Sequence, residues 1–272
     1  MLKFSANLGF LWTELSLPEA IYAAKEAGFD AVECHWPYDY DPRDIAQALA
    51  ETGLPMLGLN TIRASEESNS EESNSEEFFG LTALPGRIPQ ARAAITSAID
   101  YAEATGTRAV HVMAGRAEGD EAKETFVENL IFACDYAAGK NITILIEPIN
   151  TIDVPGYFLN TLEQAHDIIT MVARKNLKIM FDCYHVAKMA TDMITDDVIA
   201  SLKAFRPHIG HIQFASVPNR TRPDEGNLDY DAVFAEIVKM GWNHPLGAEY
   251  KPNGSTEASL GWKNLKKYSK KM

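Results

Sequence analysis

The sequence predicts a single (β/α)₈ barrel domain spanning residues 1–272. Short apolar runs rich in β-branched residues alternate with amphipathic segments of helical period along the whole chain. This alternation predicts a parallel sheet, because each helix returns the chain to the same edge of the sheet. Eight strands with no interruption for a second domain favour closure into a barrel, and such barrels typically need about 250 residues. An open, doubly wound sheet is the alternative.

The eight expected strands are apolar segments that end in polar residues. The run Ile142-Thr143-Ile144-Leu145-Ile146 is typical, because β-branched side chains suit a pleated, buried surface. The full set of expected strands covers residues 2–8, 31–36, 55–62, 108–114, 142–149, 177–184, 209–215 and 245–251.

The expected helices lie between these strands and carry start and stop signals. Ser16, Asp41 and Thr161 stand where N-cap residues belong, since their side chains can accept hydrogen bonds from the first turn. Gly53 and Gly106 stand where helices end, because glycine adopts the left-handed conformation at little cost. The expected helices cover residues 17–28, 42–53, 88–105, 119–139, 161–175, 195–206, 229–241 and 259–268.

Residues 65–77 form a low-complexity repeat, in which Ser-Glu-Glu-Ser-Asn occurs twice and is followed by Ser-Glu-Glu. The repeat contains no apolar side chain to bury, so we expect a solvated, flexible loop after the third strand. Its position on the catalytic face of a barrel allows a lid. Expansion of a surface loop is favoured instead, because such loops tolerate insertions.

The composition excludes several classes of function. The net charge of −13 disfavours binding to nucleic acid, which depends on clustered Lys and Arg. No stretch approaches the roughly 20 apolar residues of a membrane span, and no secretory signal pattern opens the chain. The odd set of distant cysteines, Cys34, Cys134 and Cys183, indicates neither a disulfide framework nor a zinc knuckle. We therefore expect a cytoplasmic protein.

Four successive strands end in an acid or an amide: Glu147, Asp182, Gln213 and Glu249. Inward side chains at the ends of neighbouring barrel strands can meet around one point, because the strands lie about 4.8 Å apart. Three carboxylates there would repel one another unless a cation lay between them. Oxygen ligands suit Mg²⁺ or Mn²⁺ better than a soft metal. A shared divalent metal site is thus predicted, although each acid alone could be a helix N-cap or a solvated loop group.

The strings that end these strands, in this order, resemble the hydroxypyruvate isomerase family. That family lies within the xylose isomerase-like barrel superfamily, which also contains the ketose 3-epimerases. The resemblance rests on segments that include Phe4-Ser5-Ala6-Asn7-Leu8, His111-Val112-Met113-Ala114-Gly115, Glu147-Pro148-Ile149-Asn150, His211-Ile212-Gln213 and Glu249-Tyr250-Lys251-Pro252. It implies that Glu147, Asp182, Gln213 and Glu249 bind the metal. Gln213 favours the hydroxypyruvate branch, because similar epimerases usually place histidine there.

The residues alone indicate metal-assisted proton transfer next to a carbonyl group. The resemblance implies a small anionic hydroxy-carbonyl substrate. The resemblance implies isomerisation of hydroxypyruvate to tartronate semialdehyde through an enediolate, with Glu147 and Glu249 as catalytic acid and base. A 2-oxo-tetronate isomerase and a ketose 3-epimerase remain alternatives. A DNA-repair endonuclease would need several zinc ions and a basic cleft. A non-catalytic sugar-acid binding barrel would not need two opposed acids.

Several further residues are candidates for substrate binding. The pattern Asp-x-x-His suggests that His185 binds a substrate oxygen, which requires it to lie beyond the strand end, because strand alternation would otherwise turn it away from Asp182. Arg220 is expected to bind the substrate carboxylate with its planar guanidinium. Lys251 shares the parity of Glu249 and could supply a second cation. A structural histidine, a surface arginine and a solvated lysine are the respective alternatives.

Other inward-facing candidates carry weaker signals. His111 is expected to face the barrel interior, as a substrate-binding or a core histidine. Asn7 and Glu33 are also expected to face inward, whereas Cys183 should turn away from Asp182 and pack in the core. Barrels of this kind often pair, and the sequence leaves a homo-oligomer open.

Overall fold

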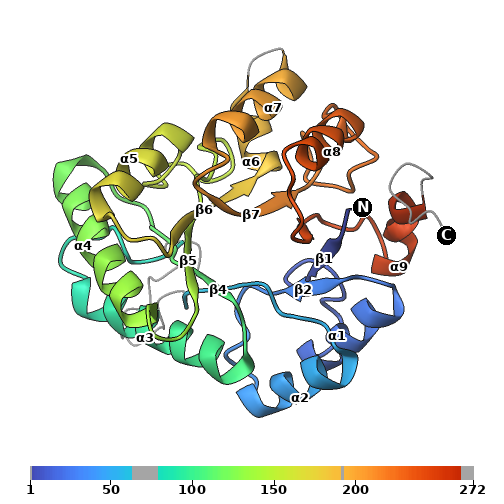
Figure 1. Ribbon diagram of the computed structural model, residues 1–272, viewed down its shortest axis with the longest axis horizontal. Coiled ribbons are helices and arrows are strands. Elements are labelled where there is room, and N and C mark those ends of the chain that lie inside the picture. Colours follow the sequence, from blue (N-terminus) through green and yellow to red (C-terminus); the bar gives the residue numbers. More distant parts are fainter. Residues whose placement is uncertain (1, 63–78, 191–192, 265–272) are drawn as a thin grey trace, which may run out of the picture.

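The computed structural model describes residues 2–62, 79–190 and 193–264. Within these residues, eight parallel strands form one sheet in the order β2-β1-β8-β7-β6-β5-β4-β3, and helices surround it (Figure 1). The strands are β1 (Phe4–Asn7), β2 (Ala31–Glu33), β3 (Leu59–Asn60), β4 (Ala109–His111), β5 (Thr143–Ile146), β6 (Leu177–Asp182), β7 (Ile209–Phe214) and β8 (Leu246–Ala248). Each strand lies within a predicted range. The low-complexity repeat at 65–77 lies outside the described residues.

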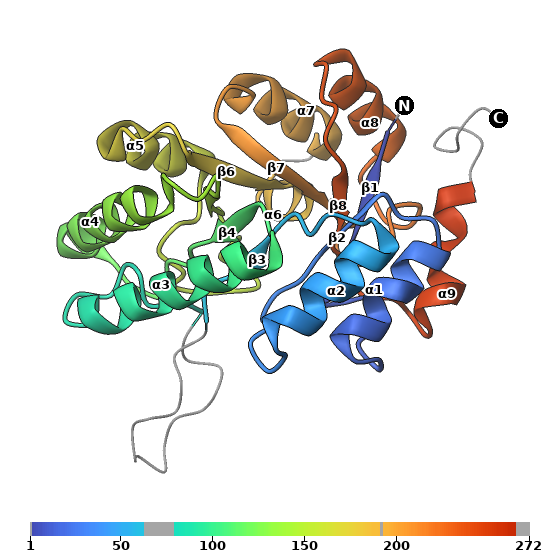
Figure 2. The same cartoon turned by 60° about the horizontal axis from the view of Figure 1, so that its bottom comes forward.

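The sheet closes between β2 and β3 through the chain that precedes β3. The N–H of Val32 donates to Pro55 O at 3.0 Å, and the N–H of Leu57 donates to Val32 O at 2.8 Å. The N–H of Asn60 donates to His35 O at 2.9 Å. The first and last strands, β1 and β8, also pair in parallel and lie side by side (Figure 2). The prediction of a barrel is therefore confirmed, and the open sheet is excluded.

The helices begin and end close to the predicted signals. Asp41 accepts from Arg43 N at 2.9 Å and Thr161 accepts from Gln164 N at 3.1 Å, so both act as N-caps. The helices are α1 (Leu17–Glu26), α2 (Pro42–Thr52), α3 (Ile88–Thr105), α4 (Gly119–Ala137), α5 (Leu162–Val172), α6 (Cys183–Lys188), α7 (Ile194–Phe205), α8 (Tyr230–Lys239) and α9 (Thr256–Ser259). None of those among the described residues is both long and apolar enough to cross a membrane.

Among the boundaries that differ from prediction, two are set by a side chain that caps a helix. The sixth strand was expected to continue to residue 184, but it ends at Asp182, whose side chain accepts from Tyr184 N at 2.8 Å and starts the short helix α6. The last helix starts earlier than expected, because Ser255 caps α9, and it continues as the 3₁₀ helix η1 (Leu260–Asn264). In both places a side-chain hydrogen bond to the backbone sets the boundary, and apolar periodicity does not reveal it.

The main apolar core lies between the sheet and the helices, as the barrel architecture requires. Inside the barrel, a smaller apolar layer consists of Ala109, Leu145 and Met180. His111, Glu147 and Asp182 follow two residues later along the same strands or just beyond their ends, so they share the inward parity of that layer. The barrel interior thus changes from apolar to polar towards the carboxyl ends of the strands.

Candidate active site and metal centre

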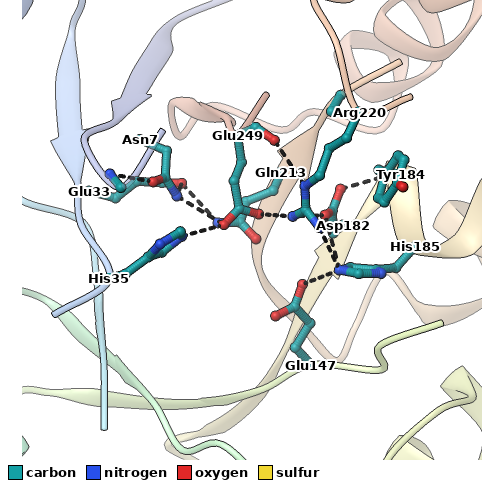
Figure 3. Close-up of polar contacts among 12 residues, drawn as sticks. Asn7, Glu33, His35, Glu147, Asp182, Tyr184, His185, Gln213, Arg220 and Glu249 are labelled. Atoms are coloured by element: carbon teal, nitrogen blue, oxygen red, sulfur yellow. Dashed lines mark hydrogen bonds and ion pairs between the residues drawn. The ribbon is translucent and has the colours of Figure 1, made fainter. Parts of the chain in front are cut away.

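The four predicted metal ligands gather at the carboxyl end of the barrel (Figure 3). Glu147 and Glu249 directly follow β5 and β8, Asp182 ends β6, and Gln213 lies in β7. Asp182 and Gln213 are partners in the register of β6 and β7. All four side chains are buried, with between 2% and 6% of their surface exposed. Buried carboxylates are costly unless a cation or hydrogen bonds compensate them, so this cluster calls for a positive partner.

Arg220, from the loop after β7, links two of the acids. Its Nη2 lies 3.0 Å from Asp182 Oδ2 and 2.7 Å from Glu249 Oε2. The guanidinium also packs between the rings of Phe10 and Tyr184, with 5.3 and 4.8 Å from Cζ to the two ring centroids. Burial and ring packing restrict the guanidinium to one plane, so Arg220 presents an ordered fork of donors to the cluster.

Burial and mutual repulsion separate the pKa values of the three acids. Burial, reinforced by the charges of Glu249 and Asp182, raises the pKa of Glu147 well above its ordinary value. Burial also raises the pKa of Asp182, to about 7, although Arg220 opposes this. Burial acts in the same sense on Glu249, but Arg220 and His35 outweigh it and lower its pKa to about 2. Arg220 alone therefore does not compensate three ionised carboxylates.

The unpaired atoms of the cluster are the kind that a hard divalent cation binds. Glu147 Oε1 and Gln213 Oε1 are buried and accept no hydrogen bond. One oxygen each of Glu147 and Asp182 lie within 4.8 Å of each other, and a ring nitrogen of His185 lies within the same distance of both. Carboxylate and amide oxygens around one point suit Mg²⁺ or Mn²⁺, and a cation there would relieve the repulsion between the acids. The residues present thus fit a divalent metal.

His185 lies on α6, beyond the end of β6, as a role in the site required. The N–H of Asn150 lies 3.3 Å and Asn150 Nδ2 lies 2.7 Å from His185 Nδ1. The amide orientation follows from Asp153, whose N–H donates to Asn150 Oδ1 and whose Oδ2 accepts from Nδ2. His185 Nδ1 is therefore an acceptor, and burial lowers the pKa of the ring to about 3.

The neutral ring consequently carries its hydrogen on Nε2, which points into the cluster. His185 Nε2 lies 3.7 Å from Glu147 Oε1 and 3.7 Å from Asp182 Oδ2. The N–H of Arg220 Nη1 is directed at Nε2 from 3.1 Å, so a hydrogen on Nε2 requires the guanidinium to turn to another acceptor. A protonated Nε2 is not a metal ligand, and once Arg220 has turned to a bound acceptor, His185 and Arg220 can each offer an N–H group to it.

Asn7 of β1 and His35, which follows β2, both contact Oε1 of Glu249, whereas Arg220 contacts Oε2. Asn7 Nδ2 donates to Glu249 Oε1 at 3.1 Å, and its own amide is oriented by Gly9 N, which donates to Asn7 Oδ1. His35 Nε2 lies 2.8 Å from the same Oε1. The sequence predicted an inward Asn7 but missed His35, which follows β2 and has the same parity as Glu33. That parity was the available signal.

Of two further predicted site residues, His111 lies in the barrel interior and Lys251 lies on the surface. His111 is buried inside the barrel, with Nδ1 3.6 Å from Glu147 Oε2, and neither ring nitrogen makes a hydrogen bond. Burial lowers the pKa of His111 to about 3, so the ring is neutral. Lys251 is exposed and is the predicted site residue that the structure does not bring into the cluster. Strand parity no longer predicts its direction, because Lys251 lies three residues past Ala248, the last residue of β8. Cys183 is fully buried, as expected.

Comparisons with known proteins identify the family of this chain. The sequence matches the xylose isomerase-like TIM barrel family over residues 21–268. The chain belongs to this family. It is 39% identical to the 2-oxo-tetronate isomerase of Cupriavidus necator, a match that covers 98% of this chain and 99% of that protein. It is 34% identical to the hydroxypyruvate isomerase of Escherichia coli, over 96% of this chain and 98% of that protein.

Among solved structures, a protein of this family from Brucella melitensis, described as an AP endonuclease of family 2, has a TM-score of 0.86. It shares 34% sequence identity, and the match covers 97% of this chain and 98% of that one. The expectations of a xylose isomerase-like barrel and of an isomerase related to hydroxypyruvate isomerase are thereby confirmed. This family member is an isomerase.

Proposed function

We propose that this isomerase interconverts hydroxypyruvate and tartronate semialdehyde through an enediolate. The observation that carries the proposal is the approach of two buried glutamates, Glu147 from β5 and Glu249 from β8, to a cluster that also presents the donors of Arg220 and His185 (Figure 3). Moving a carbonyl to the adjacent carbon requires one group to remove a proton and another to return one. Two opposed carboxylates beside hydrogen-bond donors meet this requirement.

The donors define how the substrate would lie. The guanidinium of Arg220 can bind the substrate carboxylate, because its planar fork matches the geometry of a carboxylate. The rings of Phe10 and Tyr184 hold the guanidinium in place. The Nε2–H of His185 can donate to an adjacent substrate oxygen. One glutamate then removes a proton from the hydroxymethyl carbon and releases it to solvent, and the other takes a proton from solvent and delivers it to the former carbonyl carbon. The hydroxyl proton passes to the former carbonyl oxygen, so the atoms balance.

The proposal includes a divalent cation, Mg²⁺ or Mn²⁺, held by Glu147, Asp182, Gln213 and Glu249. Its support is the pair of buried, unpaired oxygens on Glu147 and Gln213 and the repulsion among the three acids. When bound, the cation supplies positive charge that stabilises the oxygens of the enediolate. Arg220, which now links Asp182 to Glu249, would then be available to the substrate.

A second candidate substrate is 2-oxo-tetronate, favoured by the 39% identity to an isomerase of that name. Both substrates carry a carboxylate next to a carbonyl, so the same donors and acids would serve either one. A ketose 3-epimerase fits less well, because an uncharged ketose has no carboxylate for Arg220. The net charge of −13 also supports a small anionic substrate over nucleic acid.

The chain's compartment and assembly belong to the same proposal. The three cysteines are free and buried, which supports residence in a reducing cytoplasm. A homo-oligomer is compatible with the fold and stays a prediction.

The test incubates metal-stripped and Mg²⁺- or Mn²⁺-restored protein with hydroxypyruvate, 2-oxo-tetronate or a ketose in D₂O. NMR should show metal-dependent product and deuterium at the carbon that receives the proton. Glu147→Gln and Glu249→Gln should each lower kcat by at least about a hundredfold, as loss of general acid–base catalysis does. The exposed Glu14→Gln serves as the control. Full turnover in both site variants would refute the acid/base roles.

A further inference from the structure

The amide of Gln213 poses an orientation problem. Its oxygen and nitrogen ends have nearly the same size and shape, but only the oxygen can bind a cation. Packing alone therefore does not select the useful orientation, and a neighbouring group must distinguish the NH₂ from the oxygen.

Glu33 is that neighbour. Gln213 Nε2 donates to Glu33 Oε1 at 2.9 Å, although the two residues lie on β7 and β2. A carboxylate accepts hydrogen bonds and does not donate them, so it requires the NH₂ end of the amide to face it. The oxygen then faces the opposite way, and Gln213 Oε1 is indeed the buried atom that accepts no hydrogen bond.

Glu33 is itself held at both oxygens. His211 Nε2 lies 2.7 Å from Glu33 Oε2, and Asn7 Nδ2 donates to Glu33 Oε1 at 3.2 Å. His211 must be the donor whichever charge its ring carries, because the carboxylate only accepts. Glu33 is 97% buried, since 3% of its surface is exposed. Its two oxygens are thus committed to donors that define their positions.

The backbone of β8 leaves room for this contact. Gly247 is the register partner of Gln213 on β8. A Cβ at this position would lie 2.5 Å from Glu33 Oε1 and 2.8 Å from Gln213 Cγ, closer than real Cβ contacts. The missing side chain at 247 allows Glu33 to cross to Gln213 next to β8.

We infer that Glu33 is a positioning residue that turns the carbonyl oxygen of Gln213 towards the metal centre. This inference rests on the metal site of the proposed function, since it explains how one of its four ligands is oriented. Glu33 does not touch the substrate or the cation in this role; it acts through Gln213.

The substitution Glu33→Gln tests the orientation directly. His211 donates to one end of side chain 33, so the new amide would place its oxygen there and its NH₂ towards Gln213. Two NH₂ groups would then face each other, and Gln213 would rotate its own NH₂ into the metal centre. We expect Mn²⁺ to bind about 10- to 100-fold more weakly, the usual effect of losing such a partner. The free Mn²⁺ signal in electron paramagnetic resonance measures the affinity without substrate.

The exchanged pair Glu33→Gln/Gln213→Glu separates orientation from general structural support. In the double variant the NH₂ of residue 33 donates to a carboxylate at 213, whose second oxygen remains for the cation. We expect Mn²⁺ affinity to return to within about threefold of the wild type, because the hydrogen bond is restored in reverse. Gln213→Glu alone places two carboxylates in contact and should not reproduce this recovery.

The outcomes are distinguishable. If the wild type does not bind Mn²⁺, the proposed metal site is refuted, and the inference with it. If the wild type binds and folded Glu33→Gln binds equally well, only the inference is overturned. Equal loss in Glu33→Gln and in the exchanged pair would also overturn it, because the loss would then arise at Asn7, whose Nδ2 finds no acceptor at residue 33 in either variant. Glu14→Gln is the control, and thermal unfolding verifies folding. Should Glu33→Gln not fold, Glu33→Asp provides the comparison: its shorter side chain withdraws the carboxylate from Gln213 Nε2 and should also weaken binding, and unchanged binding would overturn the inference.

Discussion

His35 Nε2 and Glu249 Oε1 lie 2.8 Å apart, although 214 positions separate the two residues in the chain. This contact, together with Arg220, outweighs burial and lowers the pKa of Glu249 to about 2. Glu147, which has no such partner on its Oε1, has a raised pKa instead. The two proposed catalytic acids therefore have different surroundings, and His35 is one cause of the difference.

Replacement of His35 should slow catalysis with little effect on substrate binding. His35→Phe removes the hydrogen bond that orients the carboxylate of Glu249, so we expect kcat to fall by about 10- to 100-fold. KM should stay within about threefold, because His35 acts through Glu249. His35→Gln, which keeps a side-chain donor, should lose less. Steady-state kinetics with hydroxypyruvate tests this, and an unchanged kcat in His35→Phe would exclude the role.

Replacement of Arg220 should weaken binding of the substrate carboxylate. Arg220→Lys keeps the charge but loses the planar fork, so KM for hydroxypyruvate should rise about tenfold. Arg220→Met loses the charge as well, and a rise of about a hundredfold is expected, as for a charge-assisted hydrogen bond. Arg222→Lys is the control, since Arg222 lies in the same loop but pairs with Asp224 and Glu225. Equal KM values for all three variants would contradict the assignment.

Stabilisation by the metal should increase with pH. The raised pKa values of Asp182 and Glu147 stabilise the metal-free fold below their ordinary pKa values, and this stability is lost as pH rises through about 7 for Asp182. A cation binds the ionised groups and must displace their protons, so each proton weakens binding about tenfold per pH unit below its pKa. Mn²⁺ should therefore raise the Tm more at about pH 8 than at about pH 5.

Two of the buried histidines, His111 and His185, contribute to stability in the opposite direction. Burial lowers the pKa of His111 and of His185 from 6.5 to about 3, so their stability is present above pH 6.5 and is lost as pH falls towards 3. Thermal unfolding with Mn²⁺ and with EDTA must consequently be compared at the same pH. A shift in Tm that does not depend on pH would argue against protonated acids at the metal centre.

Asn150 should control the tautomer of His185. In Asn150→Asp no side-chain donor faces Nδ1, and the new carboxylate favours a hydrogen there instead. Long-range ¹H–¹⁵N NMR should show a protonated Nε2 in the wild type and a protonated Nδ1 in the variant. We expect kcat to fall on the order of tenfold, because the donor into the site is lost. The exposed Asn227→Asp is the control. A wild-type His185 with Nδ1 protonated would refute the tautomer.

The sequence predicted the site residues whose position depends on a local pattern. Glu147, Asp182, Gln213 and Glu249 each end an apolar run, and in a parallel barrel those ends meet at one face, so their convergence followed from counting strands. His185 could be placed only conditionally, because its position depends on where β6 stops. That boundary is set by the hydrogen bond from Tyr184 N to Asp182 rather than by hydropathy.

The failures share a physical cause. Lys251 was assigned by strand parity, yet it lies three residues past Ala248, where β8 ends, and the alternation of side-chain directions does not extend that far beyond the strand. His35 was missed for the converse reason, because it lies just past the short strand β2 and faces inward without belonging to an apolar run.

The sequence by itself determined the barrel, its element order and the acids at the strand ends, because hydrophobic periodicity and strand termini are local properties of the chain. Only the tertiary structure decided the partners of those acids. Glu33 meets Gln213 across 180 positions and Asn7 meets Glu249 across 242, and such contacts depend on strand register and on the space left at Gly247. Closure of the barrel sets that register, so no single segment of the sequence specifies it.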